Sequence, residues 1–347
     1  MVRASRVKRS TEFYDPLFEP KSPALCEDKA WPESSCAITH ALLTSEGICS
    51  LVEPSGKLVV NRSQFDRCDF EGDFTELVPA FKGCEFFRCD FGYSKWRRAR
   101  FKGCKFSRCS LSLASFENCE FRDCVFSEIG LSGNELVLDG TTITNPAEFI
   151  SSGYTNTDQD TLRVRGISID YQLMRLEGTK ATVARQVMHN LSTLGDEGAY
   201  YESVKAYHQT SLSYRLSSMR YRLSQKPAIN VAMLMLFELF VCHVERLVIE
   251  CSGKINNWGA SIGRPTITGF TIFCFFTLFY WLVGIRHGAI SAMITSLEIT
   301  LLIGYTKHAL LNDSLPVQSA FLANMVAGVI WYSVMIPTII NRISRVR

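Results

Sequence analysis

Every fifth residue is large and apolar over the middle of the first half of the chain, and this period constrains the fold more than any other feature. The large positions are Phe81, Phe86, Phe91, Trp96, Phe101, Phe106, Leu111, Phe116, Phe121, Phe126, Leu131 and Leu136. A small residue lies two positions before most of them: Cys84, Cys89, Ser94, Ala99, Cys104, Cys109, Ala114, Cys119 and Cys124. A period of five is neither helical nor that of a flat strand.

The period fits a square coil in which each repeat forms one side. The large side chain fills the centre, and the small one packs beside it near the corner. Phe65, Cys68 and Phe70 form an earlier run whose register is shifted by one residue, so Asp73–Ala80 must absorb the shift. Seven of the 13 cysteines occupy the small position, which predicts buried apolar thiols rather than redox centres or metal ligands.

These repeats resemble the pentapeptide-repeat family, whose fold is a right-handed quadrilateral β-helix. The resemblance covers roughly residues 65–136 and implies a scaffold without chemistry of its own. We expect a solenoid over 61–140, preceded by a basic, irregular segment over 1–60. No apolar core follows the basic N-terminal residues, so a secretory signal is not indicated, and a reducing cytoplasm is the expected compartment.

A coil of twenty residues predicts which surface side chains stack. Arg97 and Arg100 then lie over acidic residues of the next coil, Glu117 and Glu120. Other cations share columns without acids, and we expect an anionic ligand there, such as a nucleotide or single-stranded DNA. The candidate ligand residues are Lys82, Arg88, Tyr93, Arg97, Arg98, Lys102, Arg108 and Arg122. The alternative is a solvated basic face, or one that contacts anionic lipid.

A helical connector is predicted after the solenoid, over 141–226. Helices are expected at Asp170–Asn190 and Asp196–Gln225, with the second ending before Pro227. The second helix resembles the connector of bacterial channels that join pentapeptide repeats to a pore. Its basic, aromatic end is expected to contact lipid head groups. The segment 227–260 is apolar but holds Glu238, and we interpret it as an interfacial helix, with a third span as the alternative.

Two uncharged runs in the last quarter are long enough to cross a bilayer. Pro265–Ile285 holds 21 residues and Val317–Asn341 holds 25. Cations flank both runs, which places both termini in the cytoplasm of an inner-membrane, multi-pass protein. Between the runs, Ala289–Ile303 is apolar and about 15 residues long, which is typical of a re-entrant segment.

Span, short helix, Gly-Tyr loop and span resemble the pore domain of the potassium-channel superfamily, here over 261–347. The family filter reads T-V-G-Y-G, and this chain reads Leu302-Ile303-Gly304-Tyr305-Thr306. The expected pore residues are Glu298, Thr300, Ile303, Gly304, Tyr305, Thr306 and Lys307. Because Thr306 replaces the second glycine and Lys307 opposes cations, weak selectivity is expected.

The sequence therefore predicts a multidomain protein: a quadrilateral β-helix, an α-helical connector and an α-helical membrane pore domain with a re-entrant loop. Such a protein is expected to be a ligand-gated channel for permeant ions, assembled as a homotetramer. Its architecture resembles Hailong-type antiphage channel effectors. The alternative is a membrane-anchored docking scaffold without conductance. No phosphate-binding or hydrolase motif is present, so no enzyme, cofactor or metal is expected.

Overall fold

The computed structural model describes residues 27–28, 35–45, 57–76, 78–131, 136–155, 157–164, 166–194, 196–225, 228–303, 305–308 and 314–345. The chain divides into two compact units, Met1–Glu245 and Arg246–Arg347.

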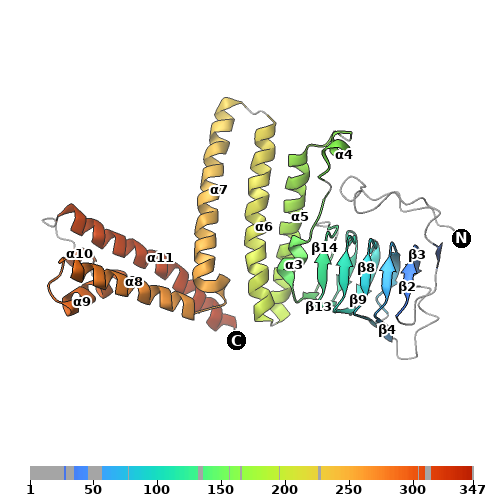
Figure 1. The fold of residues 1–347 in the computed structure, drawn as a ribbon, viewed down its shortest axis with the longest axis horizontal. Coiled ribbons are helices and arrows are strands. Elements are labelled where there is room, and N and C mark those ends of the chain that lie inside the picture. Colours follow the sequence, from blue (N-terminus) through green and yellow to red (C-terminus); the bar gives the residue numbers. More distant parts are fainter. Residues whose placement is uncertain are drawn as a thin grey trace. The chain divides into compact units, whose positions relative to one another are not determined.

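The first unit is built on a β-solenoid of about four turns. Its strands form three parallel, five-stranded sheets that run along the solenoid (Figure 1). One sheet contains β4 (Lys57–Asn61), β7 (Val78–Lys82), β10 (Arg100–Lys102), β13 (Glu120–Arg122) and β15 (Thr142–Ile143). The next contains β2 (Ala37–Thr39), β5 (Gln64–Asp66), β8 (Glu85–Phe87), β11 (Lys105–Ser107) and β14 (Val125–Ser127). The third contains β1 (Glu27–Asp28), β3 (Ala41–Thr44), β6 (Asp69–Phe74), β9 (Ser94–Arg97) and β12 (Ser115–Glu117).

The strand register confirms a coil of twenty residues. Phe101 pairs with Phe81 on one side and Phe121 on the other, and the rings stack with centroids 5.0 and 4.8 Å apart. Isolated bridges join Asp90, Ser110 and Gly130 along the remaining side. The repeat therefore forms four sides with columns of stacked aromatic rings in the centre, as the period of five predicted.

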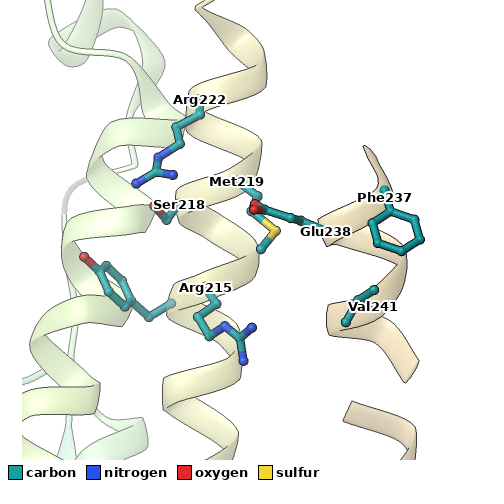
Figure 2. Close-up of a pocket in the computed structure, with 8 residues that line it drawn as sticks. Arg215, Ser218, Met219, Arg222, Phe237, Glu238 and Val241 are labelled. Carbon is teal, nitrogen blue, oxygen red and sulfur yellow. The ribbon is translucent and has the colours of Figure 1, made fainter. Parts of the chain in front are cut away.

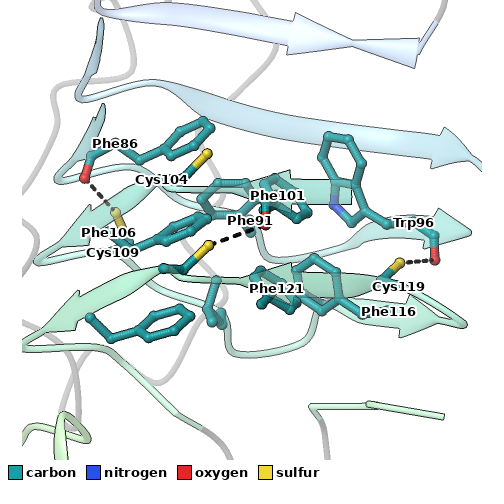
Figure 3. Packing of buried hydrophobic residues seen from close by; sticks show 14 of the residues in the cluster. Phe86, Phe91, Trp96, Phe101, Cys104, Phe106, Cys109, Phe116, Cys119 and Phe121 are labelled. Carbon is teal, nitrogen blue, oxygen red and sulfur yellow. Dashed lines mark hydrogen bonds between the residues drawn. The ribbon is translucent and has the colours of Figure 1, made fainter. Parts of the chain in front are cut away.

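The cysteines confirm their predicted place beside the aromatic column (Figure 3). The thiols of Cys109 and Cys119 donate to the carbonyls of Phe86 and Trp96 in the preceding coil, at 3.2 and 3.5 Å. Burial raises the pKa of Cys119 to about 12. A hydrogen bond with the Cys124 thiol, together with burial, raises the pKa of Cys104 to about 12. These thiols are structural and stay protonated near neutral pH.

The solenoid begins before the predicted boundary at residue 61. Strands β1, β2 and β3 and all but the last residue of β4 lie within the segment 1–60, where the sequence predicted an irregular structure. Their inward positions hold aliphatic residues, among them Leu43 and Val60, which are fully buried. Aliphatic residues at uneven spacing obscure a five-residue period, although the backbone pairing continues.

The predicted register shift is confirmed. Phe65 pairs with Phe86, twenty-one residues later, whereas the later coils repeat every twenty. Phe74 pairs and stacks with Trp96, twenty-two residues later, at 4.2 Å, whereas Phe81 pairs with Phe101, twenty residues later. Two extra residues therefore lie between Phe74 and Phe81, inside the predicted stretch, and the shorter spacing from Phe70 to Phe74 offsets one of them.

A helix hairpin covers the C-terminal end of the solenoid. Helix α3 (Pro146–Ser151) contacts β14, and α4 (Gln159–Val164) leads to α5 (Ile169–Leu194) and α6 (Glu197–Ser224). Val183, Val187 and Leu191 of α5 belong to the same buried cluster as the solenoid core. The Asn190 amide donates to the carbonyls of Leu138 and Thr141 in the last coil. The two predicted helices are confirmed, and they pack on the end of the solenoid.

Glycine in the middle of α5 has a packing role. A Cβ at Gly178 would lie 2.9 Å from Cε2 of Tyr214 on α6, so only glycine lets the two helices approach this closely.

Helix α7 (Ile229–Asn256) runs through the boundary between the two units and is followed by η1 (Asn257–Gly259). The second unit contains α8 (Gly263–Leu282), α9 (Ala289–Thr300), α10 (Tyr305–His308) and α11 (Leu315–Arg345). Helices α8 and α11 are long and apolar enough to cross a membrane. Helix α9 has 12 residues and is too short to do so.

Candidate functional site

The short helix α9 is held between the two long helices by buried polar contacts. The Ser296 hydroxyl donates to the Phe273 carbonyl on α8 at 3.0 Å. The Thr300 hydroxyl lies 2.8 Å from Oδ1 of Asn324 on α11, and the Asn324 amide donates to the Ser296 carbonyl at 3.4 Å. Polar groups in an apolar surrounding are costly unless they are paired. These contacts therefore determine the position of α9 along both long helices.

Small residues let the three helices approach each other. A Cβ at Gly328 of α11 would lie 2.4 Å from the Thr300 carbonyl oxygen at the end of α9. A Cβ at Gly269 of α8 would lie 2.4 Å from Cε2 of Trp331, whose indole donates to the Pro265 carbonyl at 2.7 Å. The contact at Gly328 is with backbone, which cannot move aside as a flexible side chain can.

Charged side chains gather where α9 and α10 meet. Lys307 Nζ lies 3.1 Å from Glu298 Oε1, and His308 Nε2 contacts Oε2 of the same carboxylate. On its other side, His308 Nδ1 lies 3.3 Å from Nη2 of Arg286, which follows α8. The sequence predicted that Lys307 opposes cations, but the structure pairs it with Glu298, so the two charges offset each other. Arg286 and His308 were not predicted, since only the contact of His308 with Glu298 and that of Arg286 with His308 mark them.

The residues predicted to form the filter differ from one another in burial and in backbone conformation. Thr300 is buried at the end of α9, Leu302 adopts a φ of 60°, and the Ile303 side chain is 77% exposed. Gly304 lies outside the described residues. Tyr305 and Thr306 begin the helical turn α10 rather than an extended strand. In a helix, successive carbonyls point along the axis instead of toward a common ion. The backbone at 305–308 therefore differs from that of the filter it resembles.

The structure places the predicted ligand residues at three separate positions around the solenoid. Lys82, Lys102 and Arg122 stack in one column on the sheet of β7, β10 and β13, as predicted. They line a groove together with Val59, Ala80, Arg100 and Glu120. Arg122 pairs with Glu120 at 2.5 Å, so an acid of the neighbouring column balances the cation.

The other predicted cations do not join this column. Arg97 lies on another side and faces Glu117 at 3.8 Å, as expected from the stacking. Arg98 is the corner residue that follows it, with a φ of 57°. Arg88, Tyr93 and Arg108 occupy the corners at the two ends of the side that holds Phe91. Arg108 pairs there with Glu128 at 2.6 Å. The eight predicted residues therefore do not form one site, and the cationic groove holds the column of Lys82, Lys102 and Arg122.

A pocket between α6 and α7 was not predicted from the sequence. Its walls are Tyr214, Arg215, Ser218, Met219 and Arg222 of α6 and Phe237, Glu238 and Val241 of α7. Figure 2 shows Glu238 extending from α7 toward α6. Arg215 donates to Glu245 of α7 at 2.5 Å, which ties the two helices together. The charge of Glu238 in an apolar run was the only sequence signal of this pocket.

A metal site needs several ligating side chains close together in the part of the chain that the structure describes. No group of three or more His, Cys, Asp or Glu side chains converges there as metal ligands do.

Comparisons with known proteins identify the solenoid. Residues 84–127 match the family model for pentapeptide repeats, with eight copies. The chain therefore contains a pentapeptide-repeat β-solenoid, followed by a helical region with two long apolar helices. No curated protein matches the chain. Among solved structures, it is similar to full-length QnrB1, a plasmid-mediated fluoroquinolone resistance protein, with 23% identity over 28% of this chain and a TM-score of 0.24. The match spans 45% of that protein, less than half its length.

Proposed function

We propose that this protein is the subunit of a ligand-gated, weakly selective ion channel of a bacterial inner membrane. The observation that carries the proposal is helix α9. It is apolar, too short to span, and inserted between two span-length helices by buried contacts from Ser296, Thr300 and Asn324. A membrane anchor needs only a span, whereas a positioned half-length helix is typical of a pore domain.

The outer surfaces of the long helices support assembly with other copies. Only 22% of the most apolar window of each helix is buried within one chain. Large side chains such as Phe270, Phe275 and Leu282 are more than half exposed. Two spans cannot enclose a pore, so several subunits around one axis are required, and we propose four. Lipid and neighbouring subunits would then cover the exposed apolar side chains.

Weak selectivity is consistent with the residues near the loop. The helical turn at Tyr305–His308 does not present a ladder of carbonyls, and Glu298 is paired with Lys307 and His308. An ion passing this region would meet side chains of both signs rather than dehydrating sites. In a bacterium such a conductance would dissipate the membrane potential, as an antiphage effector requires.

The proposed gating ligand carries phosphates and binds the groove at Lys82 and Lys102. These two lysines stack in register, and within the described ranges neither has an ion-pair partner. A phosphate-bearing chain binds such a column with counterion release, so affinity falls as salt rises.

The ligand test compares two variants by oligonucleotide binding over a salt series. Replacing both Lys82 and Lys102 with Ala should weaken binding and reduce the salt slope. The matched control is Lys105→Ala on the adjacent side, because that lysine is already paired with Glu85 at 2.8 Å. Equal loss in the control, or no binding by wild type at low salt, would exclude the groove as the ligand site.

The channel test measures ion flux from liposomes that contain the purified full-length chain. Wild type should pass small ions of both signs. Lys307→Glu should shift the reversal potential toward the value expected for cations, and Glu298→Gln toward the value expected for anions. The control Leu322→Ala, on the exposed side of α11, should leave the reversal potential unchanged. Flux no greater than in empty liposomes would exclude a pore and favour the membrane-anchored scaffold. The candidate ligand is then added to the same liposomes to test gating.

A further inference from the structure

Helix α7 exposes a continuous row of large apolar side chains. The row repeats with spacings of four, three, four and three residues, and each member is between 44% and 68% exposed: Met233, Phe237, Phe240, Val244 and Leu247. The next position in the same order is Cys251, which is also exposed. This alternation is the heptad spacing with which helices pack against each other.

A second apolar row lies directly beside the first. Its members are Leu234, Val241 and Val248, which lie seven residues apart and are all exposed. Each comes directly after a member of the first row. A two-stranded coiled coil needs only one seam, whereas apolar residues at three positions of each heptad cover two neighbouring helices. The width of the face therefore predicts an assembly of more than two helices.

The opposite side of α7 is already occupied. Cys242 is fully buried there, and Met235 and Ile249, seven residues to either side, are partly buried. The contact of Glu245 with Arg215 ties α7 to α6 from this side. Apart from Phe237 and Val241, which also line the pocket with α6, the exposed rows have no partner within the described part of the chain.

We infer that these rows form a subunit interface, in which the α7 helices of several copies pack in parallel around the symmetry axis. The inference rests on the proposed assembly of subunits and names the surface that holds it together. A parallel arrangement follows from rotational symmetry, since copies related by an axis point the same way along it.

Two features favour a second copy of the chain over a bilayer surface. A strict heptad keeps its residues on one straight seam only when helices wind around each other, because a single straight helix drifts by about 20° per heptad. A helix that lies on lipid is also rich in Lys and Arg on its polar face. The polar face of α7 is not rich in basic residues: it holds the acidic Glu238, Glu245 and Glu250 and the basic Arg246 and Lys254. The sequence predicted that 227–260 lies at the membrane interface, and we infer instead that α7 packs against the α7 helices of other copies.

Parallel packing brings Cys251 of one copy close to Cys251 of another, because equivalent seam positions form layers. Their oxidation joins the two sulfurs and transfers two electrons and two protons to an added oxidant. One such bond links two chains covalently.

The test is oxidative cross-linking of the full-length chain in membranes with copper phenanthroline, read on a non-reducing gel. Wild type should form a covalent dimer, and Cys251→Ser should lose it. In the Cys251→Ser background, Val244→Cys on the seam should restore the dimer. The matched control Arg246→Cys is two residues away, exposed, and off the seam. Variants are compared at equal amounts of membrane-inserted protein.

Each outcome decides the inference separately from the channel. Cross-linking at 251 and 244 that exceeds the control supports the interface, even if liposomes show no ion flux. Cross-linking at 244 no greater than at 246 overturns it, whatever the flux, and assigns the apolar rows to lipid instead.

Discussion

Replacing Phe101 with Ala should destabilise the solenoid where its coils stack. The ring is fully buried, stacks on Phe81 and Phe121, and contacts Phe86 and Trp96 edge-on. Removing a buried Phe costs about 3–5 kcal/mol, because apolar burial is lost and a cavity remains. Each aromatic pair adds about 0.5–1.5 kcal/mol beyond burial, which places this site toward the upper end.

Buried cysteines provide the assay. A solenoid opens locally, and a thiol in it reacts only while its coil is open. A loss of about 3–5 kcal/mol should therefore raise the labelling rate of Cys104 about 10²- to 4 × 10³-fold, since about 1.4 kcal/mol corresponds to a factor of ten. The rate is followed by mass spectrometry of the full-length chain after short exposure to a thiol reagent.

The control is Phe87→Ala in β8 of the adjacent sheet, where the ring is 41% exposed. A surface change of this kind stays within about 0.5 kcal/mol, or roughly a twofold change in rate. If Phe101→Ala accelerates the labelling of Cys104 no more than Phe87→Ala does, the ring stack is not what keeps the coil closed.

Three further predictions concern the packing of the helices and the titration of a thiol. Gly328→Ala should separate α9 from α11 and lower the thermal unfolding midpoint in detergent, because its Cβ would lie 2.4 Å from a backbone oxygen. The control Gly263→Ala, whose Cβ would have only a distant neighbour, should leave the midpoint unchanged, and equal shifts would argue against close packing. Asn190→Leu should lower the free energy of unfolding by about 1–3 kcal/mol and increase hydrogen exchange in α5, since two carbonyls of the last coil lose their donor. Arg185→Leu on the exposed side of α5 is the control, and equal exchange in both variants would show that Asn190 does not hold α5 on the solenoid. Cys119 has a pKa raised from 9.0 to about 12, so its neutral form contributes stability that is present below about pH 9 and lost as pH rises toward 12; a denaturant midpoint with the same pH dependence in Cys119→Ala would contradict this.

Much of the solenoid could be predicted from the sequence because its contacts are local and periodic. A ring at every fifth residue, such as Phe101 or Phe121, has only one way to face the same axis, and the cysteine positions follow from the same period. The N-terminal coils escaped prediction because Leu43 and Val60 fill the same central position without an aromatic signal. Column neighbours such as Lys82 and Lys102 were predictable from the twenty-residue coil, whereas the pairing of Arg108 with Glu128 was not predicted.

Runs and periods along the chain predicted the four-sided coil, the connector helices, the two long apolar helices and the short helix between them. Which side chains meet depended on how these elements pack. Glu298 pairs with Lys307 and His308, and Thr300 pairs with Asn324, because separate helices come together there. Periodicity reports how one residue relates to its neighbours in the chain, while such pairings depend on packing distances between helices, which no local pattern contains.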